Sequence, residues 1–475
     1  MFRIVILSLI CFLLSCSQEP ELVYEAPPKC SKDWSEIADD SMLTVLAENS
    51  PASYFIYKGR NMGYEYELLH EFAKDMNVRL QVLMVNNLDE MQMKLDSCIG
   101  DIIACNLTVT PERKYAFNFS TPHLTTHQVL VQRDHPDSLI TNFKQLRGKR
   151  IHVWQNSSFY ENLVSLNEQQ NLGIHIVKTE GDIISEELIR QVSEGEINYT
   201  VSDENVAKIS MHYYDNLDIS LAMSEDEEIA FAMRKGSEKL RDTINYWLNA
   251  KENQSTIGEV KRKYFKRRNL TSKANQNYSS LTGDQISPYD DVIKKESELI
   301  GWDWRLVSAI IYQESKFETW KRSWAGAFGI FQFMPETAEQ YGISENSSPE
   351  AQIHAGCRKL NKNFNQWLEE VPDTNEAIMF TLATFNCGRG HIDDARALCD
   401  KYDLDKNKWD DNVAKMMLNL SNPKYYKDPV VRNGYCRGRE TFKYPAEIMQ
   451  RYEEYKSAFP DEPIIQRSPH IAHKF

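Results

Sequence analysis

The chain has 475 residues and a formal net charge of −14 at pH 7. This length predicts about three domain-sized units, each long enough to bury a hydrophobic core. The negative charge argues against general nucleic-acid binding, for which a basic face is expected. The chain is 41% hydrophobic and 26% charged, which is typical of a folded soluble protein.

The N-terminus carries the pattern of an export signal. A basic start, Met1-Phe2-Arg3, precedes an apolar run of 11 residues, 4–14, that is too short to span a bilayer and fits a signal peptide. The following Leu13-Leu14-Ser15-Cys16 resembles the lipobox of bacterial lipoproteins. The resemblance implies that residues 1–15 are removed and that Cys16 is lipidated, with the protein anchored to the outer membrane and facing the periplasm. An ordinary cleaved signal is the alternative.

Seven cysteines remain after Cys11 is removed and Cys16 is acylated: Cys30, Cys98, Cys105, Cys357, Cys387, Cys399 and Cys436. In an oxidising exported compartment we expect some disulfides, and an odd number leaves at least one thiol outside an intramolecular pair. The pairing stays open. The spacings match no zinc site, and we expect neither a metal nor a cofactor.

Residues 16–40 contain several prolines and charges and are predicted to form a tether. Strands and helices then alternate over residues 41–268, which favours parallel α/β structure in two lobes around a cleft. The predicted strands are residues 43–47, 78–85, 101–106, 150–154, 174–177 and 199–202. The predicted helices are residues 64–76, 89–97, 157–166 and 183–192.

Five blocks in this region resemble the amino-acid-binding family of extracellular solute-binding proteins, which has the type II periplasmic-binding fold. They are residues 63–68 (GYEYEL), 100–103 (GDII), 108–113 (TVTPER), 119–122 (FSTP) and 146–150 (LRGKR). By this resemblance Arg113 clamps a ligand carboxylate, Thr108 lines the same site and Asp203 holds the ligand amine. The implied ligand is amino-acid-like, or a muropeptide. Asn106-Leu107-Thr108 stands where the family has Gly-Met-Thr, so the ligand's identity stays open.

Two further segments complete the N-terminal half. The basic run at residues 261–268 is typical of a solvated helix end, with attraction to an anionic membrane or wall polymer as the alternative. Residues 269–286 are rich in Asn, Ser and Thr and are predicted to be a linker.

Strand patterns disappear over residues 287–475, which predicts a mainly α-helical domain. We expect Ser287 to cap a helix that ends at residue 300, and Asp303 to cap the next one. Three more helices are predicted. One begins at residue 349, and the other two cover residues 375–386 and 391–401.

The helix capped by Asp303 carries an acid on its apolar stripe. Val307, Ile310 and Ile311 share one face, and Glu314 continues that face by one turn. Burial would raise the pKa of this carboxyl group, and a protonated acid near neutral pH suits general acid catalysis. The alternative is a helix-end residue that reaches solvent. A glycine-containing loop and a second helix follow, so these residues could form one wall of a cleft.

Four motifs in order resemble the lysozyme-like domain of the soluble lytic transglycosylase family. They are residues 314–317 (ESKF), 326–338 (GAFGIFQFMPETA), 385–388 (FNCG) and 440–444 (ETFKY). The resemblance implies that Glu314 is the catalytic acid. It implies substrate-binding roles for Ser315, Gln332, Met334, Asn386 and Tyr444. The chain departs from the family at Ile330-Phe331 (usually Leu-Met), at Thr384-Phe385 (usually Ala-Tyr, so that a hydroxyl is lost) and at Pro445 (often Val).

The implied activity is non-hydrolytic cleavage of the β-1,4 bond between N-acetylmuramic acid and N-acetylglucosamine in peptidoglycan. Glu314 would protonate the glycosidic oxygen and then take a proton from the muramoyl C6 hydroxyl, which closes a 1,6-anhydro ring without water. Ordinary glycosidases need a second carboxylate. Glu318, Glu336 and Glu440 are available, but none matches a catalytic position of the motif. The N-terminal domain is expected to modulate this activity. A lysozyme-like hydrolase and a solute receptor with an inactive lytic module are the alternatives.

Overall fold

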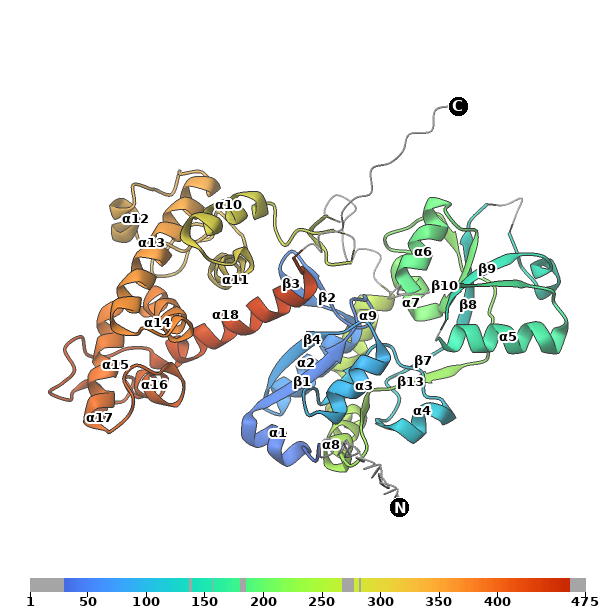
Figure 1. The fold of residues 1–475 in the computed structure, drawn as a ribbon, viewed down its shortest axis with the longest axis horizontal. Coiled ribbons are helices and arrows are strands. Elements are labelled where there is room, and N and C mark those ends of the chain that lie inside the picture. The colour runs from blue at the N-terminus through green and yellow to red at the C-terminus, as the bar shows by residue number, and fades with distance from the viewer. Residues whose placement is uncertain are drawn as a thin grey trace, which may run out of the picture.

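The computed structural model describes residues 30–135, 139–155, 157–179, 185–266, 277–281 and 283–461. The chain forms a two-lobed α/β domain followed by a helical domain (Figure 1), as the sequence predicts. The signal peptide, Cys16 and residues 17–29 of the expected tether lie outside the described residues. Within the described ranges, no helix combines the length and the apolar character that crossing a membrane requires.

The first lobe is built on a sheet with the strand order β4-β1-β5-β14-β6. Its strands are β1 (Met42–Ala47), β4 (Arg79–Met84), β5 (Ile102–Ala104), β6 (Phe117–Phe119) and β14 (Ala232–Arg234). Strand β1 runs parallel to β4 and β5, whereas β14 is antiparallel to β5 and β6. The helices of this lobe are α1 (Trp34–Asp40), α2 (Tyr64–Asp75), α3 (Leu88–Asp96), α4 (Pro111–Ala116), α8 (Glu238–Asn249) and α9 (Gln254–Phe265).

The second lobe repeats this plan with the strand order β10-β9-β11-β8-β12. Its strands are β8 (Gln128–Arg133), β9 (Arg150–Trp154), β10 (His175–Thr179), β11 (Tyr199–Asp203) and β12 (Leu217–Asp218). Its helices are α5 (Ser158–Gln170), α6 (Ser185–Glu194) and α7 (Glu204–Ser210), and the short 3₁₀ turn η1 (Phe143–Leu146) precedes β9.

The expectation of parallel sheets was wrong for one strand of each lobe. The chain crosses between the lobes through β7 (Leu124–Thr126) and returns through β13 (Glu227–Ile229), and these two strands pair antiparallel. Strands β8 and β14 follow directly after these crossings and enter their sheets against the direction of the parallel strands. Local patterning cannot report this reversal, because strand direction depends on the path between the lobes.

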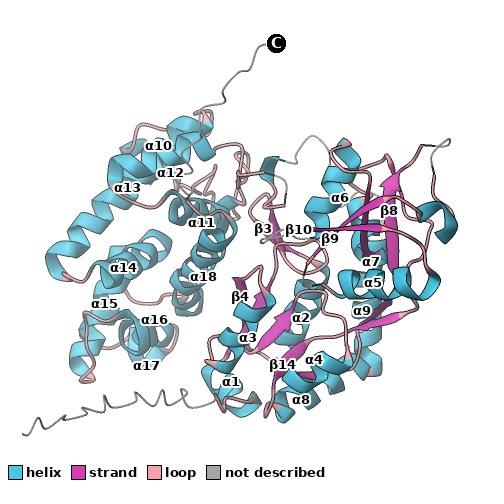
Figure 2. Ribbon diagram, turned by 45° about the vertical axis from the view of Figure 1, so that its right-hand side comes forward, coloured by secondary structure: helices cyan, strands magenta, loops and turns pink. Residues whose placement is uncertain are grey.

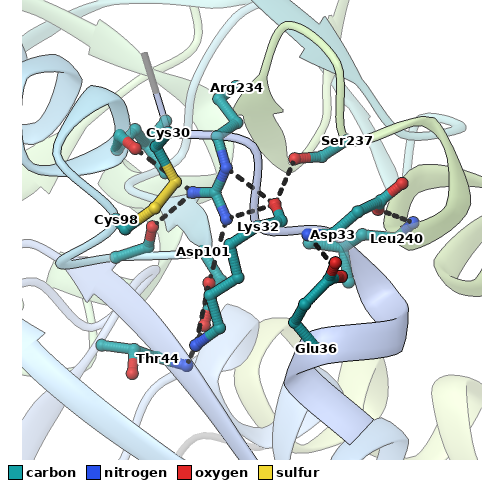
Figure 3. Close-up of polar contacts among 12 residues, drawn as sticks. Cys30, Lys32, Asp33, Glu36, Thr44, Cys98, Asp101, Arg234, Ser237 and Leu240 are labelled. Atoms are coloured by element: carbon teal, nitrogen blue, oxygen red, sulfur yellow. Dashed lines mark hydrogen bonds and ion pairs between the residues drawn. A yellow bond between two sulfur atoms is a disulfide. The ribbon is translucent and has the colours of Figure 1, made fainter. Parts of the chain in front are cut away.

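The predicted tether ends earlier than residue 40, because residues 30–40 are part of the first lobe (Figure 3). Cys30 forms a disulfide with Cys98, which answers the open question of pairing for these two cysteines. The Arg234 guanidinium donates to the Lys32 carbonyl oxygen at 2.8 Å and to Asp101 Oδ1 at 3.1 Å. These contacts fasten the start of the domain to residues far along the chain.

The linker prediction also changes. Lys58 donates from its backbone N–H to the Tyr278 carbonyl oxygen at 2.8 Å, and Ser280 donates likewise to Ile56 at 2.9 Å. Residues 277–281 therefore lie along the hairpin formed by β2 (Phe55–Tyr57) and β3 (Arg60–Met62). The basic run begins in the last turns of α9, preceded by the 3₁₀ turn η2 (Lys251–Asn253), and residues 267–268 lie outside the described part.

The predicted helical domain is confirmed. Its helices are α10 (Asp290–Ile300), α11 (Trp304–Ser315), α12 (Pro335–Gln340), α13 (Pro349–Glu370), α14 (Thr374–Cys387), α15 (Arg389–Lys401), α16 (Ala414–Asn419), α17 (Pro423–Tyr426) and α18 (Gly438–Ala458), with a kinked π turn at Trp409–Val413. Asp303 caps α11 by accepting from the Arg305 N–H at 2.9 Å. Ser287 does not cap α10, which begins at Asp290. The Ser287 hydroxyl instead donates to the Asp290 carboxylate at 2.6 Å.

The two domains share a core, and α18 joins them. One hydrophobic cluster contains Phe72 of the first lobe together with Ile310 and Tyr455 of the helical domain. Figure 1 and Figure 2 show α18 running from the helical domain to the first lobe. Near its C-terminal end, the Tyr455 hydroxyl donates to the Gly59 carbonyl oxygen at 2.8 Å, and Asn61 donates to Glu454 at 2.7 Å.

Candidate active site

Helix α11 delivers the predicted acid as expected from its sequence. Val307, Ile310 and Ile311 are fully buried, and Glu314 follows them in the last turn as a half-buried residue. The helix ends at once, because Lys316 adopts a left-handed conformation with φ +57°. Glu314 therefore sits where a buried apolar stripe meets the surface.

Tyr444 of α18 holds the Glu314 carboxyl group by donating its hydroxyl hydrogen to Oε1. Burial raises the pKa of Glu314 to about 7, although the Tyr444 hydrogen bond and the positive charges of Lys359 and Lys321 oppose the rise. The negative charge of Glu440 adds slightly to it. A carboxyl group with this pKa can both give and take a proton near neutral pH.

Three other predicted residues differ in exposure and in the contacts that they make. Gln332, in the glycine-containing loop, donates from Nε2 to the Lys321 and Gly329 carbonyl oxygens at 3.0 and 2.8 Å, which braces this loop. Met334 is 45% exposed. Asn386 accepts a 2.6 Å hydrogen bond from the Thr441 hydroxyl, so α14 and α18 meet beside Tyr444.

Ser315 departs from its expected role. Its side chain is fully buried, and its hydroxyl donates to the Ile311 carbonyl oxygen at 3.2 Å within the same helix. The hydroxyl thus closes the end of α11 and does not reach substrate. Pro445, where the family often has Val, lies inside α18 without ending the helix.

Motif reasoning missed the two lysines near the acid. Lys321 donates from Nζ to the Glu314 carbonyl oxygen at 2.7 Å, which ties the loop to the end of α11. Lys359 of α13 lies 3.7 Å from the centroid of the Phe385 ring. Neither lysine belongs to a quoted motif. The exposed side chains of Trp320 and Trp324 on the same loop, at 81% and 84%, were also passed over.

A cavity of about 100 Å³ lies between the two lobes of the N-terminal domain, and Arg113, Thr108 and Asp203 all line it, as predicted. Pro111 and Thr110 begin the short helix α4, and Arg113 follows in its first turn. The Arg113 guanidinium donates to the Thr108 carbonyl oxygen at 3.0 Å.

Asp203 comes from the other lobe, at the end of β11, and is 2% exposed. Its Oδ2 accepts from the Asn106 side-chain amide at 2.7 Å, and its Oδ1 has no hydrogen-bond partner. Burial raises the pKa of Asp203 to about 8, and the charge of Glu227 adds to the rise, whereas Arg113 opposes it.

Two carboxylates that the sequence reasoning did not single out, Glu48 and Glu186, line the same cavity. The pKa of Glu48 is raised well above its usual value, first by burial and then by the charges of Glu186, Glu65 and Asp203. Glu186 accepts from the Ser50 hydroxyl at 2.5 Å, a contact between the lobes. The pocket is therefore rich in carboxyl groups that raise one another's pKa.

No group of three or more His, Cys, Asp or Glu side chains within the described ranges is arranged to hold a metal ion.

Family models match both halves of the chain. Residues 43–267 match the bacterial extracellular solute-binding proteins, family 3, and residues 291–409 match the transglycosylase SLT domain. Tyr444 lies beyond the second match, and its hydrogen bond to Glu314 connects it to the acid in the structure.

Curated relatives match over both domains. A protein of Desulfosudis oleivorans named membrane-bound lytic murein transglycosylase F is 29% identical over 422 residues, which cover 89% of this chain and 91% of the relative. A protein of the same name from Pseudomonas putida strain GB-1 is 30% identical over 421 residues, covering 88% and 85%.

Among solved structures, a mutant of the arginine-binding protein from T. maritima is similar, with 23% identity and a TM-score of 0.43. It covers 49% of this chain and 99% of its own. An ancestral arginine-binding protein bound to arginine has 24% identity and a TM-score of 0.42, covering 47% and 98%.

Proposed function

The chain belongs to the membrane-bound lytic murein transglycosylase F family and is a lytic transglycosylase with an N-terminal binding domain; we propose that Glu314 is its catalytic acid and base. The observation that carries the assignment is the Glu314 carboxyl group held by the Tyr444 hydroxyl, with a pKa raised to about 7. Peptidoglycan is the substrate, and the reaction is that of a lyase.

In the first step, protonated Glu314 gives its proton to the glycosidic oxygen between N-acetylmuramic acid and N-acetylglucosamine. The bond from the muramoyl C1 to that oxygen breaks, and the oxygen leaves as a hydroxyl of the departing sugar. Tyr444 keeps the carboxyl group oriented because its hydroxyl stays bonded to Oε1. Substrate contacts come from Gln332, Met334 and Asn386, as the family motifs imply.

In the second step, Glu314 is a carboxylate and takes the proton of the muramoyl C6 hydroxyl. The freed oxygen bonds to C1 of the same sugar and closes the 1,6-anhydro ring, and the proton from the C6 hydroxyl restores the protonated form of Glu314. An attacking group on the same sugar has a high effective concentration, so no activated water is needed. This scheme uses one carboxyl group, in contrast to the pair of a standard glycosidase.

Product analysis tests the assignment. Wild-type protein should release muropeptides with 1,6-anhydro ends from purified peptidoglycan, and Glu314→Gln should release none while unfolding at a temperature close to that of the wild type. Mass spectrometry identifies the products, because hydrolysis gives reducing ends that are one water heavier. Reducing ends from the wild type would support the hydrolase alternative, and retained activity in Glu314→Gln would reject Glu314 as the acid.

For the N-terminal domain, we propose that the cavity binds an amino-acid-like compound or a muropeptide. Arg113 meets its carboxylate and Asp203 its amine, because a bound ammonium group would favour the charged form of the Asp203 carboxyl group. Asp203 Oδ1 supports this role, because a buried carboxylate oxygen without a partner can accept a hydrogen bond from a ligand N–H.

Binding would modulate the lyase through the contacts between the domains. The tip of the β2–β3 hairpin lies against the end of the catalytic helix: a Cβ added to Gly59 would meet Tyr455, Phe317 and Tyr312 at 2.7–2.8 Å. Tyr312 and Phe317 flank Glu314 in the sequence. Helix α18 carries Tyr444 and reaches the same hairpin through Tyr455. A change in the first lobe would therefore reach both members of the Glu314–Tyr444 pair.

For the location, we propose that Cys16 carries lipid and anchors the protein to the outer membrane, with both domains in the periplasm. The lipobox-like sequence supports this placement. Metabolic labelling with a fatty acid, compared between wild type and Cys16→Ala, tests it. Incorporation that persists in Cys16→Ala would contradict the proposal.

A further inference from the structure

Lys359 of α13 brings a positive charge to the catalytic groove from a helix that carries no quoted motif. Its Nζ lies 3.7 Å from the centroid of the Phe385 ring and 5.7 Å from that of Phe333. Phe385 directly precedes Asn386, and Phe333 directly follows Gln332. The half-buried Lys359 thus contacts the two segments that carry the predicted residues Gln332 and Asn386.

The aromatic face of Phe385 suits this neighbour. The ring occupies the position where the family usually has Tyr, and the face of an aromatic ring attracts a cation. Among the described residues, none forms a hydrogen bond or an ion pair with Lys359 Nζ, and the ammonium group contacts the two rings. The charge is therefore held in place by ring faces and is not neutralised by a bonded carboxylate.

Glu314 and Lys359 act on each other electrostatically. Burial lowers the pKa of Lys359 to about 8, and the Glu314 carboxylate opposes that fall. In return, Lys359 counteracts the rise in the pKa of Glu314 that burial causes. Each group therefore favours the charged form of the other.

The remaining charged and titratable groups that face Glu314 come from two other segments. Tyr444 and Glu440 belong to α18, and Lys321 belongs to the loop after α11. Lys321 is already engaged, because its Nζ donates to the Glu314 backbone carbonyl oxygen. Lys359 is the cation near this carboxyl group whose ammonium stays unbonded among the described residues.

We propose that Lys359 is a positioning residue of the lytic reaction, whose ammonium group stabilises the carboxylate that Glu314 becomes after it protonates the glycosidic oxygen. This proposal rests on the proposed role of Glu314 as acid and base. Lys359 itself exchanges no proton in this scheme. Its charge assists the first transfer by stabilising the carboxylate product, and this carboxylate then removes the C6 hydroxyl proton.

The test is the pH dependence of kcat/KM on purified peptidoglycan for the full-length wild type, Lys359→Met and Lys359→Arg. The kcat/KM profile reports the pKa values of the free enzyme. Without the ammonium group the pKa of Glu314 rises, so the alkaline limb of Lys359→Met should move to higher pH. Its maximal rate should fall by about 10- to 100-fold, somewhat less than the loss of a direct transition-state hydrogen bond.

Lys359→Arg keeps the charge, so its alkaline limb should stay near that of the wild type. Lys362→Met is the matched control, because Lys362 is an exposed lysine three residues further along the same helix, and it should behave as the wild type. An alkaline limb of Lys359→Met that coincides with the wild type would overturn the proposal. So would an equal shift in Lys359→Arg.

Failure of this proposal is distinguishable from failure of the proposed function. Residual activity of Glu314→Gln at any pH would remove Glu314 from the mechanism altogether. An inactive Glu314→Gln together with an unmoved limb in Lys359→Met would keep Glu314 as the acid and exclude Lys359 as its charge partner. Thermal unfolding of each variant separates a loss of fold from a loss of charge.

Discussion

Both domains bury carboxyl groups with raised pKa values, but their surroundings differ. Glu314 is approached by a hydroxyl donor and two lysines, all of which lower its pKa against the effect of burial. In the N-terminal pocket, the charges of Glu186 and Asp203 add to the effect of burial on Glu48. A raised pKa alone therefore does not identify a catalytic acid. Hydrogen-bond donors and cations around a carboxyl group favour reversible proton transfer. A cluster of carboxyl groups favours binding of a cationic ligand.

The largest effect should come from removing the donor in the active site. In Tyr444→Phe the Glu314 carboxyl group loses its orienting hydrogen bond, and its pKa rises because that bond no longer opposes burial. We expect kcat to fall by about 100-fold, the scale of a lost transition-state hydrogen bond. Turnover of purified peptidoglycan across pH measures both changes, and an alkaline limb that moves to lower pH would contradict the comparison.

The second prediction concerns stability, since a buried acid destabilises the fold once it ionises. The pKa of Glu314 rises from 4.5 to about 7 on folding, so the folded state holds its proton more tightly. The stability that this proton binding contributes is therefore fully present below pH 4.5. It falls as the pH rises to 7 and stays low above that. Glu314→Gln should raise the unfolding free energy at pH 8 by at most about 3 kcal/mol, with little gain at pH 4.

Asp203 in the N-terminal pocket allows the same measurement on a second buried acid. The pKa of Asp203 is raised to about 8, so its destabilisation continues to grow between pH 7 and pH 8. The gain of Asp203→Asn should still increase over that interval, where the gain of Glu314→Gln has levelled off. Thermal unfolding at closely spaced pH values compares the two variants. Identical pH profiles would show that the two acids do not differ as described.

A third prediction follows from the carboxylates in the pocket. An amino acid with a second amino group, such as lysine or diaminopimelate, should bind the full-length protein at least about tenfold more tightly than leucine or glutamate. Glu186→Gln should reduce this preference because it removes one lining carboxylate. Glu187→Gln is the control, since Glu187 pairs with Arg190. Isothermal titration measures the affinities, and tighter binding of glutamate than of lysine would refute the expectation.

The smallest effect is expected at the contact between the domains. Gly59→Ala places a methyl group against Tyr455, Phe317 and Tyr312, and should lower lytic activity by about three- to tenfold, the range of coupling through packed side chains. Gly148→Ala is a matched control, because Gly148 has the same φ of +72° but nothing within 4 Å of an added Cβ. Equal rates in the two variants would leave the hairpin without a role in the active site.

The sequence predicted what depends on local spacing. The apolar stripe of α11, the Asp303 cap and the position of Glu314 all follow from residues within a few turns of one another. Arg113 and Asp203, which the family resemblance placed on two facing lobes, line one cavity. These predictions hold because helix periodicity and family motifs are short-range signals.

The sequence could not predict contacts made by chain segments that are distant in the sequence. Lys359 approaches Glu314 only because α13 packs beside α14 and the loop after α11. Residues 30–40 belong to the first lobe, where the Arg234 guanidinium donates to the Lys32 carbonyl oxygen and to Asp101. Ser315 belonged to a matching motif, yet its hydroxyl was satisfied inside its own helix.

With Cys16 lipidated as we propose, the disulfide between Cys30 and Cys98 would limit how far the enzyme extends from the membrane. If Cys16 is held in the membrane as we propose, the chain from Cys16 to the disulfide extends at most about 50 Å. The disulfide fixes the end of this segment to the first lobe. A pulling force from the membrane would therefore act on the ligand-binding domain and not on the site of Glu314. The length of this segment would then determine which layer of the cell wall the enzyme can reach, whatever the lobes bind.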